Sequence, residues 1–158
     1  MTQAFKTSVF DRLKASSEHG PTWTLEQLKD AVARDLELLL NTRVALPEAM
    51  FASYPEAGNS LANYGLIDFA GMCMTSDEDR KKICSAVKRA IEQHEPRLHT
   101  VQAQLRVHCA PVNRVDFVIS ALLKSAVTAP VQFDAVLEPS SQHYSIRKVR
   151  SMHKTGAL

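Results

Sequence analysis

The spacing of apolar residues changes at the tripeptide Glu95-Pro96-Arg97. Upstream of it, apolar residues recur every three or four positions, as they do on one face of a helix. Downstream of it, they alternate with polar residues, as they do in a half-buried strand. Pro96 lacks an N–H group and disfavours helical geometry for the residue before it. The tripeptide therefore predicts a rigid corner, at which a helix ending near His94 gives way to an extended strand.

Two helices are expected before the corner. The first begins at Thr24, where Gln27 completes a capping box, and it frays near residues 41–43. The second begins at Thr75-Ser76 and continues with acidic residues that complement the positive end of the helix dipole. Each helix has one apolar stripe to bury against a core. The stripes consist of Leu25, Leu28, Val32, Leu36 and Leu39 in the first helix and Ile83, Val87, Ala90, Ile91 and His94 in the second.

Strands are expected after the corner. Three alternating segments and a short fourth one lie at Val101–Val107, Val115–Leu123, Val131–Leu137 and Tyr144–Val149. Val118 and Leu122 place apolar residues on the second face of the second segment, which predicts a central strand covered on both sides. The order of segments predicts an α+β domain. In it, two main helices and a packed loop region precede a largely antiparallel or mixed sheet of three to four strands.

The rest of the chain divides by composition. Residues 47–75 combine prolines and glycines with many apolar residues, which predicts an irregular loop packed onto the domain. Residues 1–23 are expected to form an N-terminal arm, residues 24–149 a single domain, and residues 150–158 a basic C-terminal tail. A chain of 158 residues is long enough for one such domain to bury a substantial core.

Composition argues against several classes of protein. The net charge of +2 is too small to indicate a nucleic-acid binder. The first residues lack the apolar run of a secretory signal, and no apolar run approaches the length of a membrane span. The cysteines are odd in number and have no paired spacing: Cys73, Cys84 and Cys109. We therefore expect reduced thiols in a cytosolic protein that neither binds nucleic acid nor inserts into a membrane.

Motifs for catalysis and metal binding are missing from the sequence. His94 and His99 superficially resemble a zinc-protease pair, but their spacing is five rather than four and Pro96 breaks the required helix. No phosphate-binding loop or nucleophile elbow is present, so no cofactor is expected. A glycosidase would need two convergent carboxylates. The nominal candidates, which nothing in the sequence brings together, are Glu95, Asp116 and Asp134. We therefore expect no catalytic residue and no metal site.

The remaining features favour a protein that binds other proteins. The first and last strands of the sheet are candidate edges that accept a strand from another chain. Arg97 beside a rigid proline suits a bidentate contact with a partner carboxylate. The same arginine equally suits an internal brace to a helix end or to Glu95. The residues alone leave these two interpretations of Arg97 evenly balanced.

Four segments in a consistent order resemble the TssE family of type VI secretion baseplate proteins, which is related to the wedge protein of contractile phage tails. These segments are Ser8–Leu13, Val32–Arg43, Asn63–Phe69 and Glu95–Leu98, and Val131–Asp134 fits the same pattern. Together they are specific, whereas any one alone is weak. Two positions depart from the family, since Ile67 replaces a common proline and His94 replaces a usual aromatic residue.

The resemblance implies a non-enzymatic baseplate component of a contractile secretion system, located in the cytoplasm at the membrane-docked baseplate. It implies docking on other wedge proteins, TssF, TssG and TssK, through Glu95, Pro96 and Arg97. It also implies a fold like that of the sheath subunit domain, whose strand edge would template assembly of the sheath proteins TssB and TssC. Of the two charged residues at the corner, we expect Arg97 to face the partner.

Two alternative functions are weaker. A lysozyme-like enzyme that cleaves peptidoglycan would suit an injection machine, but the sequence lacks an export signal and an evident carboxylate pair. An anti-adaptor on the same fold would bind proteolysis or signalling factors, and the ordered segments argue against that function. A structural role in the baseplate is therefore the expected function.

Overall fold

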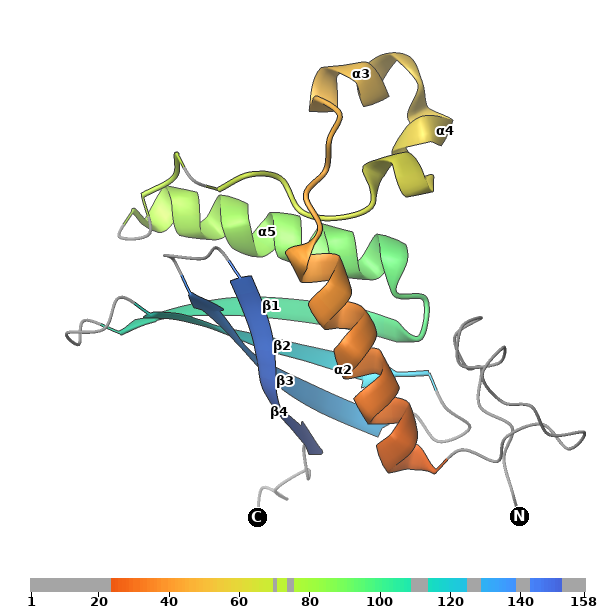
Figure 1. Ribbon diagram of the computed structural model, residues 1–158, viewed down its shortest axis with the longest axis vertical. Coiled ribbons are helices and arrows are strands. Elements are labelled where there is room, and N and C mark those ends of the chain that lie inside the picture. Colours follow the sequence, from red (N-terminus) through yellow and green to blue (C-terminus); the bar gives the residue numbers. More distant parts are fainter. Residues whose placement is uncertain are drawn as a thin grey trace, which may run out of the picture.

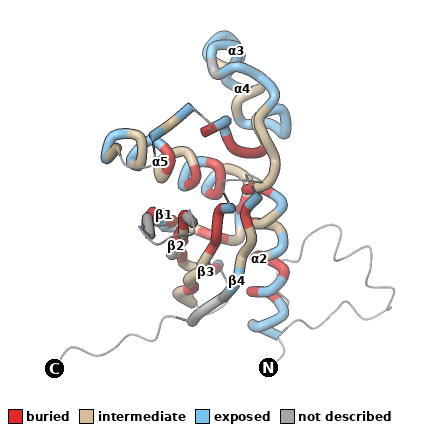
Figure 2. The backbone as a smooth tube through the Cα atoms, turned by 60° about the vertical axis from the view of Figure 1, so that its left-hand side comes forward, coloured by how far each residue is buried: buried red, intermediate tan, exposed pale blue. Residues whose placement is uncertain are grey.

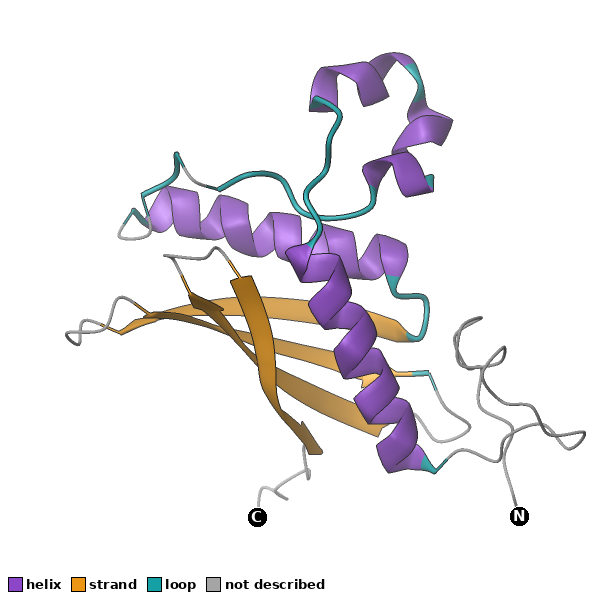
Figure 3. Ribbon diagram, in the orientation of Figure 1, coloured by secondary structure: helices purple, strands orange, loops and turns teal. Residues whose placement is uncertain are grey.

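The computed structural model describes residues 24–69, 71–73, 76–108, 114–124, 129–138 and 143–151, and every structural statement below concerns these residues. The elements in chain order are α2 (Leu25–Asn41), α3 (Glu48–Ser53), α4 (Pro55–Gly58), the 3-10 helix η1 (Leu61–Asn63), α5 (Asp77–His94), β1 (Leu98–His108), β2 (Arg114–Leu123), β3 (Ala129–Glu138) and β4 (His143–Ser151) (Figure 1). Helices precede strands, which confirms the predicted α+β class (Figure 3).

The two long helices begin where their capping residues predict. The Thr24 hydroxyl accepts a hydrogen bond from the Gln27 N–H at 3.2 Å, and the Gln27 side chain accepts one from the Thr24 N–H at 2.9 Å. Ser76 caps α5, which ends at His94. The predicted stripes are buried at Leu28, Val32, Leu36, Leu39, Ile83, Val87, Ala90 and Ile91, while Leu25 and His94 are half-buried.

The four strands form one sheet in the order β1-β2-β3-β4, and all neighbouring pairs are antiparallel. Helix α5 packs along β1 and helix α2 packs along β4 (Figure 1). The helices and one sheet face enclose the core, whose largest sheet residues are Phe117, Phe133 and Tyr144. Strand β4 is longer than expected and continues to Ser151, two residues into the predicted tail.

The second face of the sheet carries buried apolar residues, as expected, but they lie outside the core that the described helices cover. Val118 and Val136 lie on it and are only 7% and 2% exposed, yet they are not part of the core between the helices and the sheet. Both long helices pack on the opposite face. Strand pairing places Gln104 and Asp134 directly beside Val118. Among the described elements, helices cover the central strand on one side only, whereas on the second face Val118 is buried, as predicted, and Leu122 is half-buried.

The segment between the long helices is only partly packed on the domain. Leu66 and Phe69 are buried, as expected. Residues 46–63, called the projection below, contain α3, α4 and η1 and extend away from the sheet (Figure 1). No described side chain of the projection is buried (Figure 2). The expected packing therefore holds at Leu66 and Phe69 and fails for the projection.

A short neck, made of residues 42–44 and 65–66, joins the projection to the rest of the domain. It explains why the projection is not packed on the core. The Leu66 N–H donates to the Thr42 carbonyl at 2.8 Å, and the Val44 N–H donates to the Leu66 carbonyl at 3.0 Å. Gly65 has φ +122°, and a Cβ at this position would lie 2.6 Å from the Thr42 oxygen. Only glycine tolerates so close an approach in this conformation. Because the neck holds both ends of the projection together, the apolar residues between them stay away from the core.

Candidate functional site

The corner lies where the sequence predicts it. Helix α5 ends at His94, and the Glu95 N–H still donates to the Ile91 carbonyl at 2.8 Å. Pro96 has no N–H with which to continue the helix, and its side chain is exposed. The Leu98 N–H donates to the Glu95 carbonyl at 3.0 Å, which closes the turn and starts β1. Pro96 is therefore the outermost residue of a tight hydrogen-bonded corner.

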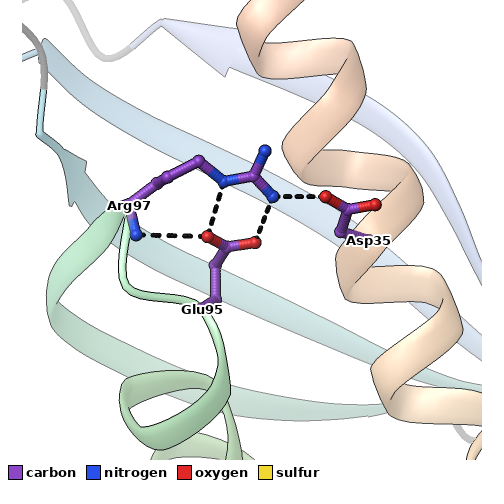
Figure 4. Close-up of polar contacts among 3 residues, drawn as sticks. All are labelled: Asp35, Glu95 and Arg97. Atoms are coloured by element: carbon purple, nitrogen blue, oxygen red, sulfur yellow. Dashed lines mark hydrogen bonds and ion pairs between the residues drawn. The ribbon is translucent and has the colours of Figure 1, made fainter. Parts of the chain in front are cut away.

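Glu95 and Arg97 bind each other across this corner. Arg97 Nε donates to Glu95 Oε1 at 2.7 Å, and Arg97 Nη2 donates to Glu95 Oε2 (Figure 4). The Arg97 backbone N–H also donates to Glu95 Oε1, at 3.1 Å. The two side chains are only 5% and 11% exposed. Two parallel N–H···O bonds form a bidentate ion pair, which offsets the cost of removing both charges from water.

A third charged residue comes from the other long helix. Arg97 Nη2 also donates a hydrogen bond to Oδ2 of Asp35 in α2, although the two residues are 62 positions apart in the sequence (Figure 4). Arg97 thereby ties α2, the end of α5 and the start of β1 together. We call Asp35, Glu95 and Arg97 the charged brace. It contains two carboxylates and one guanidinium, and Asp35 is the most exposed of the three side chains at 35%.

The electrostatics of the brace keep Arg97 charged. Burial by itself would lower the pKa of Arg97, but the hydrogen bonds and charges of Glu95 and then of Asp35 outweigh burial and raise it. One nitrogen of the guanidinium, Nη1, is buried without a hydrogen-bond partner. A buried donor of this kind costs about 1–3 kcal/mol. The brace is therefore a permanent ion network that leaves one donor unused.

The brace bears on the two interpretations of Arg97. Arg97 and Glu95 make the internal contact, and contact of Glu95, Pro96 or Arg97 with another protein stays a prediction. Sequence reasoning missed Asp35, although a signal was present. Asp35 follows the buried Val32 by three residues and precedes the buried Leu39 by four, so it lies on the inward stripe of α2. A carboxylate on such a stripe needs a partner.

The end of α5 also holds the projection. The Gln93 side chain donates a hydrogen bond to the Gly58 carbonyl, and His94 Nε2 lies 3.0 Å from the Asn63 carbonyl oxygen. The rings of Tyr64 and His94 meet edge to face, with centroids 5.1 Å apart. The same helix end therefore positions both the corner and the projection.

Strand β4 is an edge of the sheet, and side chains of α2 form hydrogen bonds with the backbone of its first half. The Asn41 side chain donates to the Tyr144 carbonyl and accepts from the Tyr144 N–H, both at 2.8 Å. Glu37 accepts from the Ile146 N–H at 2.9 Å. These outward-pointing backbone groups are already paired, so the first half of β4 cannot use them to bind a strand from another chain.

Strand β1, the opposite edge, is contacted by α5. Arg80 Nη2 donates to the Leu105 carbonyl at 3.5 Å. Burial raises the pKa of Cys84, against the lowering effects of a hydrogen bond with the backbone of Leu105 and of the Arg80 charge. The backbone at the middle of β1 is therefore partly occupied by side chains of α5, and Cys84 is held as a protonated thiol. Cys73 and Cys84 are free of disulfides, whereas Cys109 lies outside the described residues.

The nominal catalytic carboxylates do not converge with Glu95. Asp116 and Asp134 are diagonal neighbours on β2 and β3, on the sheet face away from the helices. Glu95 belongs to the brace on the other side. Within the described ranges, no three His, Cys, Asp or Glu side chains are grouped so that they could hold a metal ion. No helix in the same ranges has the length and apolar character needed to cross a membrane.

Comparison with known proteins identifies the family. The chain matches the family described as baseplate wedge protein gp25 over residues 26–127, which include α2 from its second residue, the projection, α5, the corner, β1 and β2. It is also similar to a chain of a solved structure described as "The baseplate complex from the type VI secretion system", with 15% identity, 82% of this chain and 97% of that chain covered, and a TM-score of 0.48. No match was found among curated proteins. The chain belongs to the baseplate wedge protein gp25 family.

Proposed function

We propose that this protein is a structural subunit of a type VI secretion baseplate. In this role it docks on other wedge subunits through the corner and offers a strand edge on which the contractile sheath assembles. The family match over residues 26–127 is the observation that carries the proposal. The assignment to type VI secretion rests on the ordered segments from Ser8–Leu13 to Glu95–Leu98, which resemble the TssE family.

The proposed docking partners of the corner are TssF, TssG and TssK. Pro96 is exposed, and Glu95 and Arg97 hold it in a fixed orientation through the brace. A rigid surface loses little conformational entropy on binding, which favours affinity. In this arrangement Pro96 contacts the partner directly, and Arg97 meets the partner through the 11% of its side chain that is exposed.

Co-expression with TssF, TssG and TssK, followed by affinity purification, tests the docking proposal. The unmodified protein should co-purify with them. Pro96→Glu should reduce recovery by about tenfold or more, equivalent to about 1.4 kcal/mol. Its melting temperature should stay unchanged because the side chain is exposed.

The matched control is Gln104→Glu, which adds the same charge at an exposed position on the far sheet face. This variant should co-purify like the unmodified protein. If Pro96→Glu also co-purifies normally while loss of Arg97 unfolds the protein, then the corner is only an internal brace and the docking assignment is wrong.

We place the proposed contact with the sheath proteins TssB and TssC at the second half of β4, residues 147–151. The first half is bonded by α2, as described above. A register shift opposite Asp134 and Ala135 separates the two halves. Antiparallel strands alternate inward and outward backbone groups, and the alternation after this bulge points the N–H of Val149 outward. This N–H is suited to pair with an added strand.

Replacement of Val149 tests this edge. Val149→Pro removes the outward N–H and keeps the inner ladder to β3, so it should abolish co-sedimentation with assembled TssB and TssC. Val149→Ala keeps the N–H and is the matched control, which should co-sediment. Equal behaviour of the two variants would mean that this edge does not bind the sheath.

The proposed role involves no catalysis and is located in the cytoplasm at the membrane-docked baseplate. The Glu95 carboxylate accepts three hydrogen bonds from Arg97 through both of its oxygens, so it is committed to an internal contact. Incubation of the pure protein with peptidoglycan should release no fragments. Release that disappears in Glu95→Gln would contradict the proposal and revive the lysozyme-like alternative.

A further inference from the structure

The projection gathers the exposed apolar surface of the molecule. Six large apolar side chains are exposed among the described residues, and four of them lie within residues 46–63. Their exposed fractions are 39% for Leu46, 50% for Met50, 68% for Tyr54 and 82% for Leu61. Single exposed apolar residues are ordinary, but a concentration of them on one feature marks an interaction surface.

Folding of the domain does not explain these residues. The helices of the projection span only six, four and three residues, which is far below the length at which isolated helices are stable in water. No described side chain among them is buried. The projection therefore contributes little apolar burial to the isolated chain, and its apolar residues serve another purpose.

The projection is nevertheless held in one orientation. The neck fixes its two ends, Gly58 accepts a hydrogen bond from Gln93, and Asn63 lies against His94. A surface positioned in this way is ready for binding, because little entropy is lost when it is covered.

Charge selects the partner. The projection contains two acidic residues, at positions 48 and 56, and no lysine, arginine or histidine, in a chain whose net charge is +2. An apolar surface that carries only negative charges is complementary to an apolar surface bordered by lysine or arginine.

The projection also continues from the corner. Tyr64 connects them: its ring packs on His94, and its pKa is raised by burial and then by the charges of Asp35 and Glu95. The phenol therefore lies within electrostatic reach of the brace. The corner and the projection form neighbouring parts of one side of the molecule (Figure 1).

We propose that the projection is a second docking surface, which binds an apolar patch bordered by lysine or arginine on another subunit of the baseplate. The proposal rests on the baseplate function proposed above and adds the surface and the chemistry of the partner. Met50, Tyr54 and Leu61 supply the apolar contact, and Glu56 supplies a negative charge at its border.

Co-purification with TssF, TssG and TssK tests this proposal. A combined variant, Met50→Ser, Tyr54→Ser and Leu61→Ser, should reduce recovery by tenfold or more and leave the melting temperature of the isolated protein unchanged. Glu56→Lys should weaken binding, and raising the salt concentration should weaken binding of the unmodified protein. The matched control is Leu38→Ser, which removes a 65% exposed leucine from α2 and should bind normally.

Four outcomes would overturn the proposal. Normal recovery of the combined variant would exclude the projection as a docking surface. A lower melting temperature of that variant in isolation would mean that the chain itself covers the projection. A dimer of the isolated protein that the variant converts to a monomer, measured by light scattering, would identify the occupant as a second copy. Failure of the unmodified protein to co-purify would reject the baseplate function as well, whereas normal recovery of the combined variant alone would reject only this surface.

Discussion

The charged brace and the projection depart from the usual distribution of residues in opposite ways. In the brace, Glu95 and Arg97 are charged and nearly buried. In the projection, Tyr54 and Leu61 are apolar and mostly exposed. Buried charges and clustered exposed apolar residues are the two informative exceptions to ordinary burial. They have different consequences here, because the charges of the brace pair with one another within the chain, whereas the apolar side chains of the projection stay exposed.

This difference separates stability from binding. The brace connects α2 to the end of α5 and the start of β1, so its loss should unfold the domain. The projection is attached only by its neck and the end of α5, so changes to its exposed side chains should leave the domain intact. The following five comparisons test this difference through the stability of the domain.

Loss of the guanidinium should have the largest effect. Arg97→Met leaves Glu95 as a buried carboxylate without its cation, which should lower the free energy of unfolding by about 3–5 kcal/mol. Urea unfolding followed by circular dichroism measures this. The control is Lys88→Met, since the Lys88–Glu92 pair is 50% and 42% exposed and should contribute less than about 1 kcal/mol. Similar losses at both positions would mean that the brace behaves as a surface ion pair.

The neck should be the next most sensitive position. Gly65→Ala places a Cβ 2.6 Å from the Thr42 carbonyl oxygen at a positive φ, so we expect a loss of about 1–3 kcal/mol in the same unfolding experiment. Gly58→Ala is the matched control inside the projection. Its Cβ would make an ordinary contact of 3.6 Å with Phe51, so stability should hardly change. A harmless Gly65→Ala would show that the neck does not constrain the projection.

Removal of the buried Tyr144 hydroxyl should have a smaller effect on the free energy of unfolding, and the effect should be stabilising. Tyr144 is 1% exposed and its hydroxyl has no hydrogen-bond partner, so Tyr144→Phe should increase the free energy of unfolding by about 1 kcal/mol at neutral pH. Tyr54→Phe is the control, because the Tyr54 side chain is 68% exposed and should make no measurable difference. A destabilised Tyr144→Phe protein would mean that the hydroxyl is satisfied.

Tyr144 also predicts that the free energy of unfolding depends on pH. Burial raises the pKa of Tyr144 from 10.0 to about 12, despite a lowering effect of Arg43. Above pH 10 the unfolded tyrosine loses its proton while the folded one retains it, so the unfolded state binds fewer protons and stability falls as pH rises toward 12. Tyr144→Phe should lose less stability over this interval, as measured by urea unfolding at several pH values. An identical alkaline loss in both proteins would contradict the assignment.

The smallest expected effect lies at the tip of the projection. Leu61 is 82% exposed, so Leu61→Ala should change the free energy of unfolding by less than about 0.5 kcal/mol. Leu66, just after the projection, is 1% exposed, and Leu66→Ala should cost about 2–5 kcal/mol. Thermal unfolding of the two variants compares them directly. A strongly destabilised Leu61→Ala protein would mean that the projection belongs to the cooperative core.

Much of the fold was predictable because its signals are local. The capping box at Thr24, the end of α5 before Pro96 and the alternation in each strand depend on residues a few positions apart. The bulge near the start of β1 had no such signal, and Thr100 adopts φ 54° there, which is rare for a β-branched residue. The sequence also predicted that residues 47–75 pack on the domain. This prediction fails for the projection, because composition does not reveal how a loop is attached.

The candidate site shows the same division. Glu95, Pro96 and Arg97 could be singled out from the sequence, since a proline between opposite charges predicts a rigid corner. The contact with Asp35 could not, because it joins residues 62 positions apart and depends on how α2 packs across the sheet. Pairing of the β4 edge with α2 and the outward position of the projection also arise from packing. Hydrophobic period and capping are set by neighbours in the chain, whereas the direction in which a charge or an apolar side chain faces is decided only when distant elements meet.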